Sequence, residues 1–285
     1  MSNLAAWMAR GSYFDTGEGH VFHVEAGTGE VLVLLHGFPT SSWDWHKVFD
    51  ALAQRYRVIA FDKLGYGFSD KPRDGDYSIT AHLRRTLKLL NALGVSEARV
   101  LAHDNGNTVA QAWLAHQIEA PAISTRISHL CFLNGGLFPE MHRARLMQKL
   151  LLSPVGGLLT RVITAGSFGR SLAAVFGPDT RPTRQDLADY WTLMSRGQGQ
   201  YLLHRHIHYI RERRSNRARW VGALEQSPVP IALIDGVHDP VSGAHMVEHF
   251  RRLLPGRPVV ELPCGHFPQV EMPQEVLEAL ARLWP

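Results

Sequence analysis

The feature of this sequence that most constrains its fold is an abrupt change of pattern at Asp104, within the stretch LAHDNGNTVA. The apolar run 98–102 predicts a short buried strand, and apolar residues at helical spacing begin directly after Asp104. A strand that passes into a helix without a loop forms a tight elbow, so its tip is strained and its neighbours must be small. Ala102 and Gly106 lie two positions to either side. Asp104 is therefore either a nucleophile at an elbow or an ordinary helix N-cap.

Length and composition limit the class of protein. The chain has 285 residues, 45% of them hydrophobic and 20% charged, as in a soluble globular protein with one large α/β domain carrying an insertion, or two small domains. No run is long enough to span a bilayer, and the N-terminus does not resemble a signal peptide. Cys131 and Cys264 lie in apolar runs, which predicts buried thiols and a reducing, cytoplasmic compartment.

The positive charge of the chain is concentrated in one place. The net charge is +4, and the excess of basic residues falls in the stretch 205–219. This stretch lies within the segment HRHIHYIRERRSNRARW, residues 204–220. We interpret this stretch as a solvated helix face, with contact to an anionic substrate or a membrane surface as the alternative. We expect no nucleic-acid partner and no stable insertion into a membrane.

Apolar and alternating runs predict the elements around the elbow. Strands are expected at 12–14 and 21–25 as an edge hairpin, and at 31–35, 57–61, 127–133, 229–234 and 258–262 as buried strands. Helices are expected after the elbow and at 40–54, 79–93, 146–152, 185–195, 201–211, 243–254 and 274–284. The predicted fold is α/β, a doubly wound and mostly parallel sheet of residues 1–136 and 225–285, interrupted after Asn134 by a helical cap of residues 137–224.

Polar residues follow several of the predicted strands. Asp104 ends one strand, Asp239 comes just after another, and His266 follows the last. In a sheet of this kind, ligands bind at the carboxyl ends of the strands. A nucleophile candidate, an acid and a histidine therefore follow one another along the chain, each at a strand end, in an order that occurs in catalytic triads.

Several motifs carry a resemblance to a known family. The segments HGFPTSSWDW, FDKLGYGFSDKP, HDNG, GVHDPV and CGHFPQVEMP resemble the epoxide hydrolase and haloalkane dehalogenase branch of the α/β hydrolases. More closely, NGGLFPEMHR, FGPDTRP and RARWVGAL are similar to segments of the group formed by the mesoderm-specific transcript protein and its bacterial relatives. The resemblance implies an α/β-hydrolase fold and hydrolysis through an alkyl-enzyme ester, with a small, largely apolar substrate, water and no cofactor.

The expected chemistry explains the residue types. The carboxylate of Asp104 is ionised at neutral pH and can displace a leaving group at a saturated carbon. His266 then acts as general base on the water that attacks the ester, and Asp239 orients the imidazole. The backbone N–H groups of Phe38 and Asn105 are expected to form the oxyanion hole.

Two other sets of residues are candidates with less support. Some members of the branch take their acid from the region of Glu140, so Glu140 is a second acid candidate. His204 and His208 lie one helical turn apart, but no third ligand has a clear spacing, so we expect no metal site.

Residues of the cap and the elbow distinguish between the possible leaving groups. Dehalogenases of the branch usually have Trp directly after the nucleophile, where this chain has Asn105. Epoxide hydrolases generally use two cap tyrosines, and Tyr209 lies about where the second occurs. No tyrosine lies near 151–152, where the first would be, and Tyr190 is a substitute candidate. We therefore predict epoxide hydrolysis, with dehalogenation or ester hydrolysis as alternatives. A third alternative, a non-catalytic or signalling protein, is disfavoured by the intact catalytic set.

Overall fold

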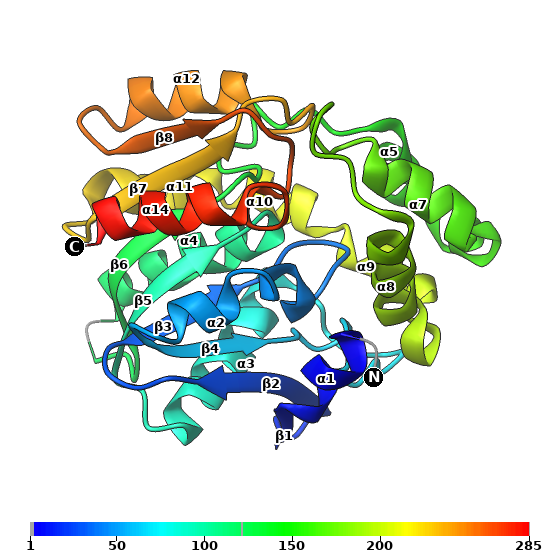
Figure 1. The fold of residues 1–285 in the computed structure, drawn as a ribbon, viewed down its shortest axis with the longest axis horizontal. Helices are drawn as coiled ribbons and strands as arrows, with labels where there is room; N and C mark the ends of the chain where they lie inside the picture. The colour runs from blue at the N-terminus through cyan, green and yellow to red at the C-terminus, as the bar shows by residue number, and fades with distance from the viewer. Residues whose placement is uncertain (1–2, 121, 285) are drawn as a thin grey trace.

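A mixed sheet of eight strands forms the centre of the computed structural model, which describes residues 3–120 and 122–284 (Figure 1). The strands are β1 (Gly11–Asp15), β2 (His20–Ala26), β3 (Val31–Leu35), β4 (Arg57–Phe61), β5 (Glu97–Ala102), β6 (Arg126–Phe132), β7 (Ile231–Gly236) and β8 (Val259–Leu262). Their order in the sheet is β1-β2-β4-β3-β5-β6-β7-β8. The pairs β1–β2 and β2–β4 are antiparallel, and the strands from β4 to β8 are paired in parallel. The predicted doubly wound, mostly parallel sheet is confirmed.

The sequence of each strand matches its position in the sheet. β3 is written VLVLL and β7 IALIDG, and nearly all of their side chains are buried because helices cover both faces of the sheet. In Figure 1, α2 (Phe49–Leu52) and α14 (Pro273–Leu283) lie in front of the sheet, while α3 (Ile79–Ala92), α4 (Asn105–Glu119) and α11 (Arg217–Gln226) lie behind it. No residue of the edge strand β1 is fully buried, as expected where the sheet meets solvent.

The helix predicted at 40–54 is wrong. The segment forms a short 3₁₀ helix, η1 (Ser42–Trp45), and the single turn α2. The Ser41 hydroxyl accepts the Trp43 N–H, and the Asp62 carboxylate accepts the Ser42 N–H at 2.7 Å. The side chains of Trp43 and Trp45 are buried in the core. Contacts with other parts of the chain thus hold this backbone, in place of a continuous helical ladder.

Residues 137–224, all of them described, contain helices and no strand, and we refer to this segment as the cap. The helices are α5 (Leu146–Leu151), α6 (Gly156–Leu159), η2 (Thr160–Val162), α7 (Ala165–Ala173), α8 (Arg184–Ser195), η3 (Arg196–Leu202), α9 (Leu203–His206), α10 (Tyr209–Ser215) and most of α11. The sequence pattern missed α6, η2, α7 and α11, and the helix predicted at 201–211 is broken into η3, α9 and α10. α11 packs against α4 of the core.

The cap is fastened to the loop that follows β8. The Glu271 carboxylate accepts the Gly177 N–H at 2.8 Å and the Thr180 hydroxyl at 2.5 Å, both in the cap segment between α7 and α8. The same carboxylate accepts the N–H groups of Gly265 and Phe267, each at 2.8 Å. One buried end of the cap is therefore joined to the backbone around residue 266.

No helix within residues 3–120 and 122–284 combines the length and the apolarity that crossing a bilayer would need.

Candidate active site

Asp104 lies at the tip of a strained elbow between β5 and α4. Its backbone has φ 47° and ψ −107°, a conformation that costs a residue with a side chain on the order of 1–3 kcal/mol. A Cβ atom at Gly106 would collide with the Leu35 carbonyl oxygen, and one at Gly135 would lie 2.7 Å from the Asp104 Cα. The Asp104 side chain makes no capping hydrogen bond to α4. The geometry is that of an elbow and not of an ordinary N-cap.

The Asp104 carboxylate is held by the turn that follows β3. Phe38, one of the two residues predicted to form the oxyanion hole, donates its N–H to Asp104 Oδ2 at 2.9 Å. Asn105, the second residue predicted there, begins α4, and its side-chain Oδ1 accepts a hydrogen bond from Lys63 Nζ at 2.6 Å. Lys63 Nζ also donates to the His36 carbonyl oxygen at 2.7 Å. Lys63 therefore ties the turn to the elbow.

Lys63 was missed by the sequence analysis, although it lies only two residues after the end of β4. Its side chain is buried, and burial lowers its pKa to about 7 against the opposing influence of the Asp104 carboxylate. A lysine placed after a strand end, within a glycine-rich turn, is the only signal in the sequence that could have indicated this role.

Asp239 and His266 form a buried, hydrogen-bonded pair after β7 and β8. His266 Nδ1 lies 2.7 Å from Asp239 Oδ2. The Asp239 carboxylate also accepts the Val241 N–H at 2.8 Å and the Ser242 hydroxyl at 2.6 Å. Asn134 Nδ2, at the end of β6, donates to Asp239 Oδ2 at 3.2 Å. The structure therefore brings together the acid and the histidine that the sequence predicts.

The charged groups of this site stabilise one another's ionised forms. Burial acts to raise the pKa of Asp239, but the charge and hydrogen bond of His266 win and hold it at about 2. Burial acts to lower the pKa of His266, yet Asp239 and Asp104 raise it to about 9. The pKa of Asp104 is lowered, because His266, Arg213 and the Phe38 N–H outweigh its burial. At neutral pH the site therefore holds an anionic Asp104 beside a cationic His266.

Arg213 is a further charged residue at the site, and it comes from α10 of the cap. Its Nη2 donates to the Asp104 carbonyl oxygen at 2.8 Å and lies 3.7 Å from Asp104 Oδ1. Its Nε donates to the Thr108 hydroxyl at 2.6 Å. Arg213 lies in the basic stretch 205–219 and is buried, so for this residue the interpretation as a solvated helix face is wrong. The even spread of basic residues along that stretch gives no sign of which one turns inward.

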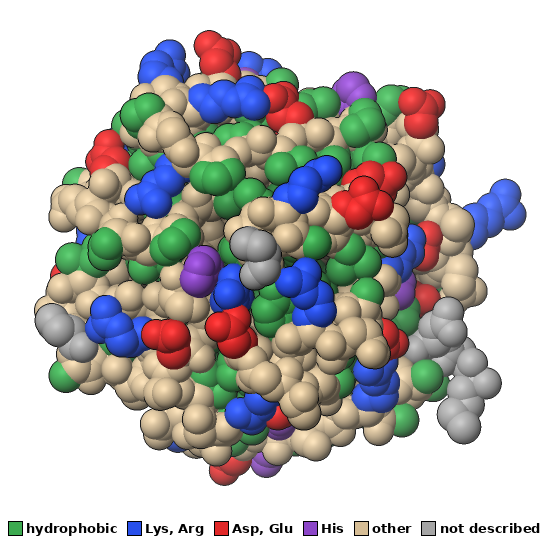
Figure 2. Space-filling view, turned by 60° about the vertical axis from the view of Figure 1, so that its left-hand side comes forward, with side chains coloured by type: hydrophobic (Ala, Val, Ile, Leu, Met, Phe, Trp, Pro, Cys, Tyr) green, Lys and Arg blue, Asp and Glu red, His purple; other side chains and the backbone are tan. Residues whose placement is uncertain are grey.

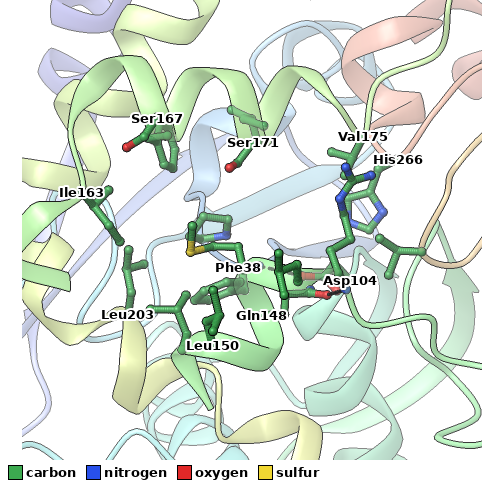
Figure 3. Close-up of a pocket in the computed structure, with 18 of the residues that line it drawn as sticks. Phe38, Asp104, Gln148, Leu150, Ile163, Ser167, Ser171, Val175, Leu203 and His266 are labelled. Carbon is green, nitrogen blue, oxygen red and sulfur yellow. Dashed lines mark hydrogen bonds between the residues drawn. The ribbon is translucent and has the colours of Figure 1, made fainter. Parts of the chain in front are cut away.

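A largely apolar cavity of about 360 Å³ opens onto Asp104 and His266 (Figure 3). Figure 3 shows these two residues at one end, Ile163 and Ser167 at the other, and Phe38 between them. The apolar side chains that line the cavity come mainly from the cap and include Leu146, Met147, Leu150, Leu151, Ile163, Phe168, Leu172, Val175 and Leu203. Such a lining suits an apolar substrate.

The two cap tyrosines are buried beside the cavity but are not among the residues that line it. The Tyr209 ring lies 5.8 Å from the Phe38 ring, and its hydroxyl has no hydrogen-bond partner among the described residues. The Tyr190 ring lies 6.1 Å from the Phe267 ring. Burial, together with the Asp44 carboxyl, raises the pKa of Tyr190 well above its usual range. Both phenols therefore keep their protons at neutral pH.

Glu140 is not at the cavity. Its carboxylate forms an ion pair with Arg217 at 2.7 Å and lies 3.4 Å from His249 Nε2, at the partly exposed junction of cap and core. Asp239, and not Glu140, is the partner of His266. The assignment of Glu140 to the site is corrected, because its charge is already paired elsewhere.

The histidines of the cap do not converge on one point. His206 stacks on Tyr66 with ring centroids 4.3 Å apart, while His204 lies near Gly157. Over the part of the chain that the structure describes, no three His, Cys, Asp or Glu side chains are placed to hold a metal ion.

Comparisons with known proteins agree with this architecture. A family model described as alpha/beta hydrolase fold matches residues 30–273. The mesoderm-specific transcript protein of Mus musculus is 40% identical over 291 aligned residues, covering 97% of this chain and 86% of that protein. A Mycobacterium tuberculosis protein named LipZ and described as a hydrolase is 35% identical over 286 residues, 99% of this chain and 98% of that protein. The structure of the epoxide hydrolase CorEH superposes with a TM-score of 0.75 at 22% identity, covering 96% of this chain and 98% of that one.

The pairing of His266 with Asp239 predicts a measurable change in proton affinity. Asp239→Asn should lower the pKa of His266 from about 9 toward the ordinary value of 6.5, because the variant removes the nearest charge that favours the imidazolium. The measurement is an NMR pH titration of the imidazole nitrogens, with the His266 signal assigned by its loss in His266→Gln. Glu140→Gln is the matched control and should leave the pKa unchanged. A larger effect of Glu140→Gln than of Asp239→Asn would contradict the assignment of the acid.

Proposed function

The chain belongs to the α/β-hydrolase family and is a hydrolase of that superfamily, and from this premise we propose that it opens epoxides through a covalent ester of Asp104. The observation that carries the proposal is an aspartate, in place of serine, at the elbow tip, with Asp239 and His266 paired beside it. A carboxylate that attacked an ester carbonyl would form a less stable anhydride. The same carboxylate forms a stable ester when it attacks a saturated carbon, which favours a substrate such as an epoxide.

The proposed reaction has two steps. In the first, Asp104 Oδ1 bonds to an epoxide carbon, the carbon–oxygen bond of the ring breaks, and the ring oxygen takes up a proton. In the second, His266 removes a proton from water as the water attacks the Asp104 carbonyl carbon, and the oxyanion on Oδ2 faces the Phe38 N–H. Collapse of this intermediate expels an alkoxide, which takes the proton from His266 and leaves as a diol. The carboxylic acid of Asp104 then returns a proton to His266, which restores the carboxylate.

The charges of the free site explain the order of these steps. While Asp104 is anionic, it helps to raise the pKa of His266 to about 9, so the imidazole carries a proton and is a poor base. Formation of the ester removes the negative charge of Asp104. The pKa of His266 then falls, so the imidazolium gives up its proton, which restores the phenol that protonated the ring oxygen. The neutral imidazole can then accept a proton from water in the second step. The first reaction thereby activates the base for the second.

The lining of the cavity favours an epoxide over a haloalkane. Asn105 follows the nucleophile, and none of the residues that line the cavity is a tryptophan, so an indole N–H cradle for halide is missing from it. The likeness to the epoxide hydrolase CorEH, at 22% identity, is a likeness of fold.

The covalent intermediate can be trapped. In His266→Gln the water lacks its base, so the ester should accumulate on incubation with an apolar terminal epoxide such as styrene oxide. Mass spectrometry of the digest should find the substrate's mass on the peptide that contains Asp104, and the double variant with Asp104→Asn should carry none. An adduct on another peptide, or release of chloride or bromide from haloalkanes faster than any epoxide is turned over, would overturn the proposed reaction.

Tyr209 is our candidate for the acid that protonates the ring oxygen. Its unpartnered hydroxyl keeps its proton, and its ring packs against Phe38, whose N–H holds the nucleophile. Tyr209→Phe should lower the rate of alkylation in stopped-flow experiments by about tenfold or more, as for loss of a general acid. Tyr190→Phe is the matched control and should change the rate far less. Equal rates for wild type and Tyr209→Phe would remove Tyr209 from the mechanism.

Arg213 is expected to keep Asp104 ionised during catalysis. The other charged or titratable groups whose charge acts on this carboxylate are His266, His103, Lys63 and His142. Arg213→Gln should raise the pKa of Asp104, and the acid limb of the pH–rate profile for alkylation should move up by roughly one pH unit. Arg213→Lys should restore the profile, because it restores the charge. An acid limb that stays in place in Arg213→Gln would show that Arg213 acts only in packing.

As a matched control, Arg217→Gln removes an arginine of the same region whose partner is Glu140. Its acid limb should coincide with that of the wild type.

A further inference from the structure

The outer part of the cap exposes a cluster of large apolar side chains. Of the nine large apolar side chains exposed among the described residues, five lie between residues 146 and 162. They are Leu146, Met147, Val155, Leu158 and Val162, and we call them the outer cap face. Leu146 and Val162 are 72% and 70% exposed, so most of each side chain is in contact with solvent. The helices that carry them are neighbours, because α6 packs against both α5 and η2. Exposed apolar side chains gathered in this way mark an interaction surface more often than a scatter of single residues does.

The same segment carries charge of one sign. Residues 141–178 include five lysines and arginines (Arg143, Arg145, Lys149, Arg161 and Arg170) and contain no aspartate or glutamate. Within residues 3–120 and 122–284, none of these five forms an ion pair. Several surface arginines elsewhere are paired with carboxylates, as in Arg219–Glu119 and Arg251–Glu261, each at 2.7 Å. Figure 2 views a different face, where Lys and Arg lie among Asp and Glu.

The outer cap face is also the rim of the catalytic cavity. Leu146 and Met147 are exposed to solvent and at the same time line the cavity. Leu150 and Leu151, one turn further along α5, continue the apolar lining inward, toward Asp104. In Figure 1, α5 and α7 project from the body of the molecule on the side away from α12 (Ala244–Leu253) and α14. A molecule held against this face would therefore have an apolar path to the nucleophile.

We propose that the outer cap face docks on an anionic lipid surface and that the substrate enters the cavity from the lipid phase. Apolar side chains would enter the acyl boundary, while the lysines and arginines around them would contact lipid phosphates. A second copy of the chain fits this face poorly, because two faces that lack acidic residues would repel each other. Entry of the substrate from the lipid phase rests on the proposed function, whereas docking itself does not. The substrate class is an apolar or amphiphilic molecule that partitions into membranes.

The experiment is a vesicle co-sedimentation assay on the full chain. Vesicles of phosphatidylcholine with about 30 mol % phosphatidylglycerol should bind the wild type at least tenfold more strongly than pure phosphatidylcholine vesicles. The double variant Leu158→Ser/Val162→Ser removes apolar contacts, and Lys149→Gln/Arg161→Gln removes charge. Each should weaken binding about fivefold or more, and about 0.5 M salt should weaken binding of the wild type similarly. Ile118→Ser and Arg219→Gln alter exposed residues elsewhere and should bind as the wild type does.

Hydrolysis of a dissolved substrate separates this inference from the proposed function. Leu158 and Val162 do not line the cavity, so their double variant should hydrolyse a water-soluble epoxide at the wild-type rate. Equal binding to both kinds of vesicle, with hydrolysis intact, would overturn the docking proposal alone. A dimer in analytical ultracentrifugation that Leu158→Ser/Val162→Ser dissolves would overturn it in favour of a second copy. Vesicle binding without hydrolysis of any epoxide would count against the proposed reaction and leave docking standing.

Discussion

The buried carboxylate of Asp104 is the charge around which the rest of this structure is arranged. A lone anion in an apolar interior is costly, and here its cost is offset by groups from four separate parts of the chain. The turn after β3 supplies the Phe38 N–H, the loop after β8 supplies His266, and the cap supplies Arg213. Lys63, which follows β4, donates a hydrogen bond to the side chain of Asn105, the residue next to Asp104. Removing any one of these groups leaves the Asp104 carboxylate less well stabilised, so we expect the site to respond as a unit.

The cap is part of this arrangement and not only a cover. Arg213 crosses from α10 to bond the Asp104 carbonyl oxygen and the Thr108 hydroxyl, which belong to the elbow and the helix after it. A shift of α10 relative to the core would therefore alter both the geometry and the electrostatics of Asp104. This contact gives the cap a direct influence on the chemical step, in addition to its influence on which molecules enter the cavity.

The sequence predicts the parts of the structure that depend on local pattern. Strands such as 31–35 and 57–61 are continuous apolar runs, and the structure places β3 and β4 at those positions. The elbow can be predicted because a strand, a small residue, a polar tip and a helix occur in direct succession. The segment 40–54 was predicted incorrectly because Ser41 and Asp62 hold its backbone, and the second partner lies outside any local window.

The residues that the sequence could not place are those whose roles depend on direction. Arg213 is one arginine among several in α10, and only packing decides that it faces Asp104. Tyr209 and Tyr190 were identified as cap tyrosines, but their phenols lie behind Phe38 and Phe267 and do not line the cavity. The sequence pattern gives the spacing of such side chains along a helix. It does not give the rotation of short helices joined by kinks such as Gly197 and Gln198.

The fastening of the cap by Glu271 has a consequence for turnover. Because Glu271 holds both Gly177 and the backbone beside His266, and because the His266 N–H donates to the Val175 carbonyl oxygen at 2.9 Å, the cap cannot swing away from this side as a rigid lid without displacing the catalytic histidine. Leu146 and Met147, at the start of α5, are exposed and line the cavity, so small molecules can pass at this edge without displacing His266. Exchange of the cavity's contents and alignment of the histidine thus depend on different edges of the cap.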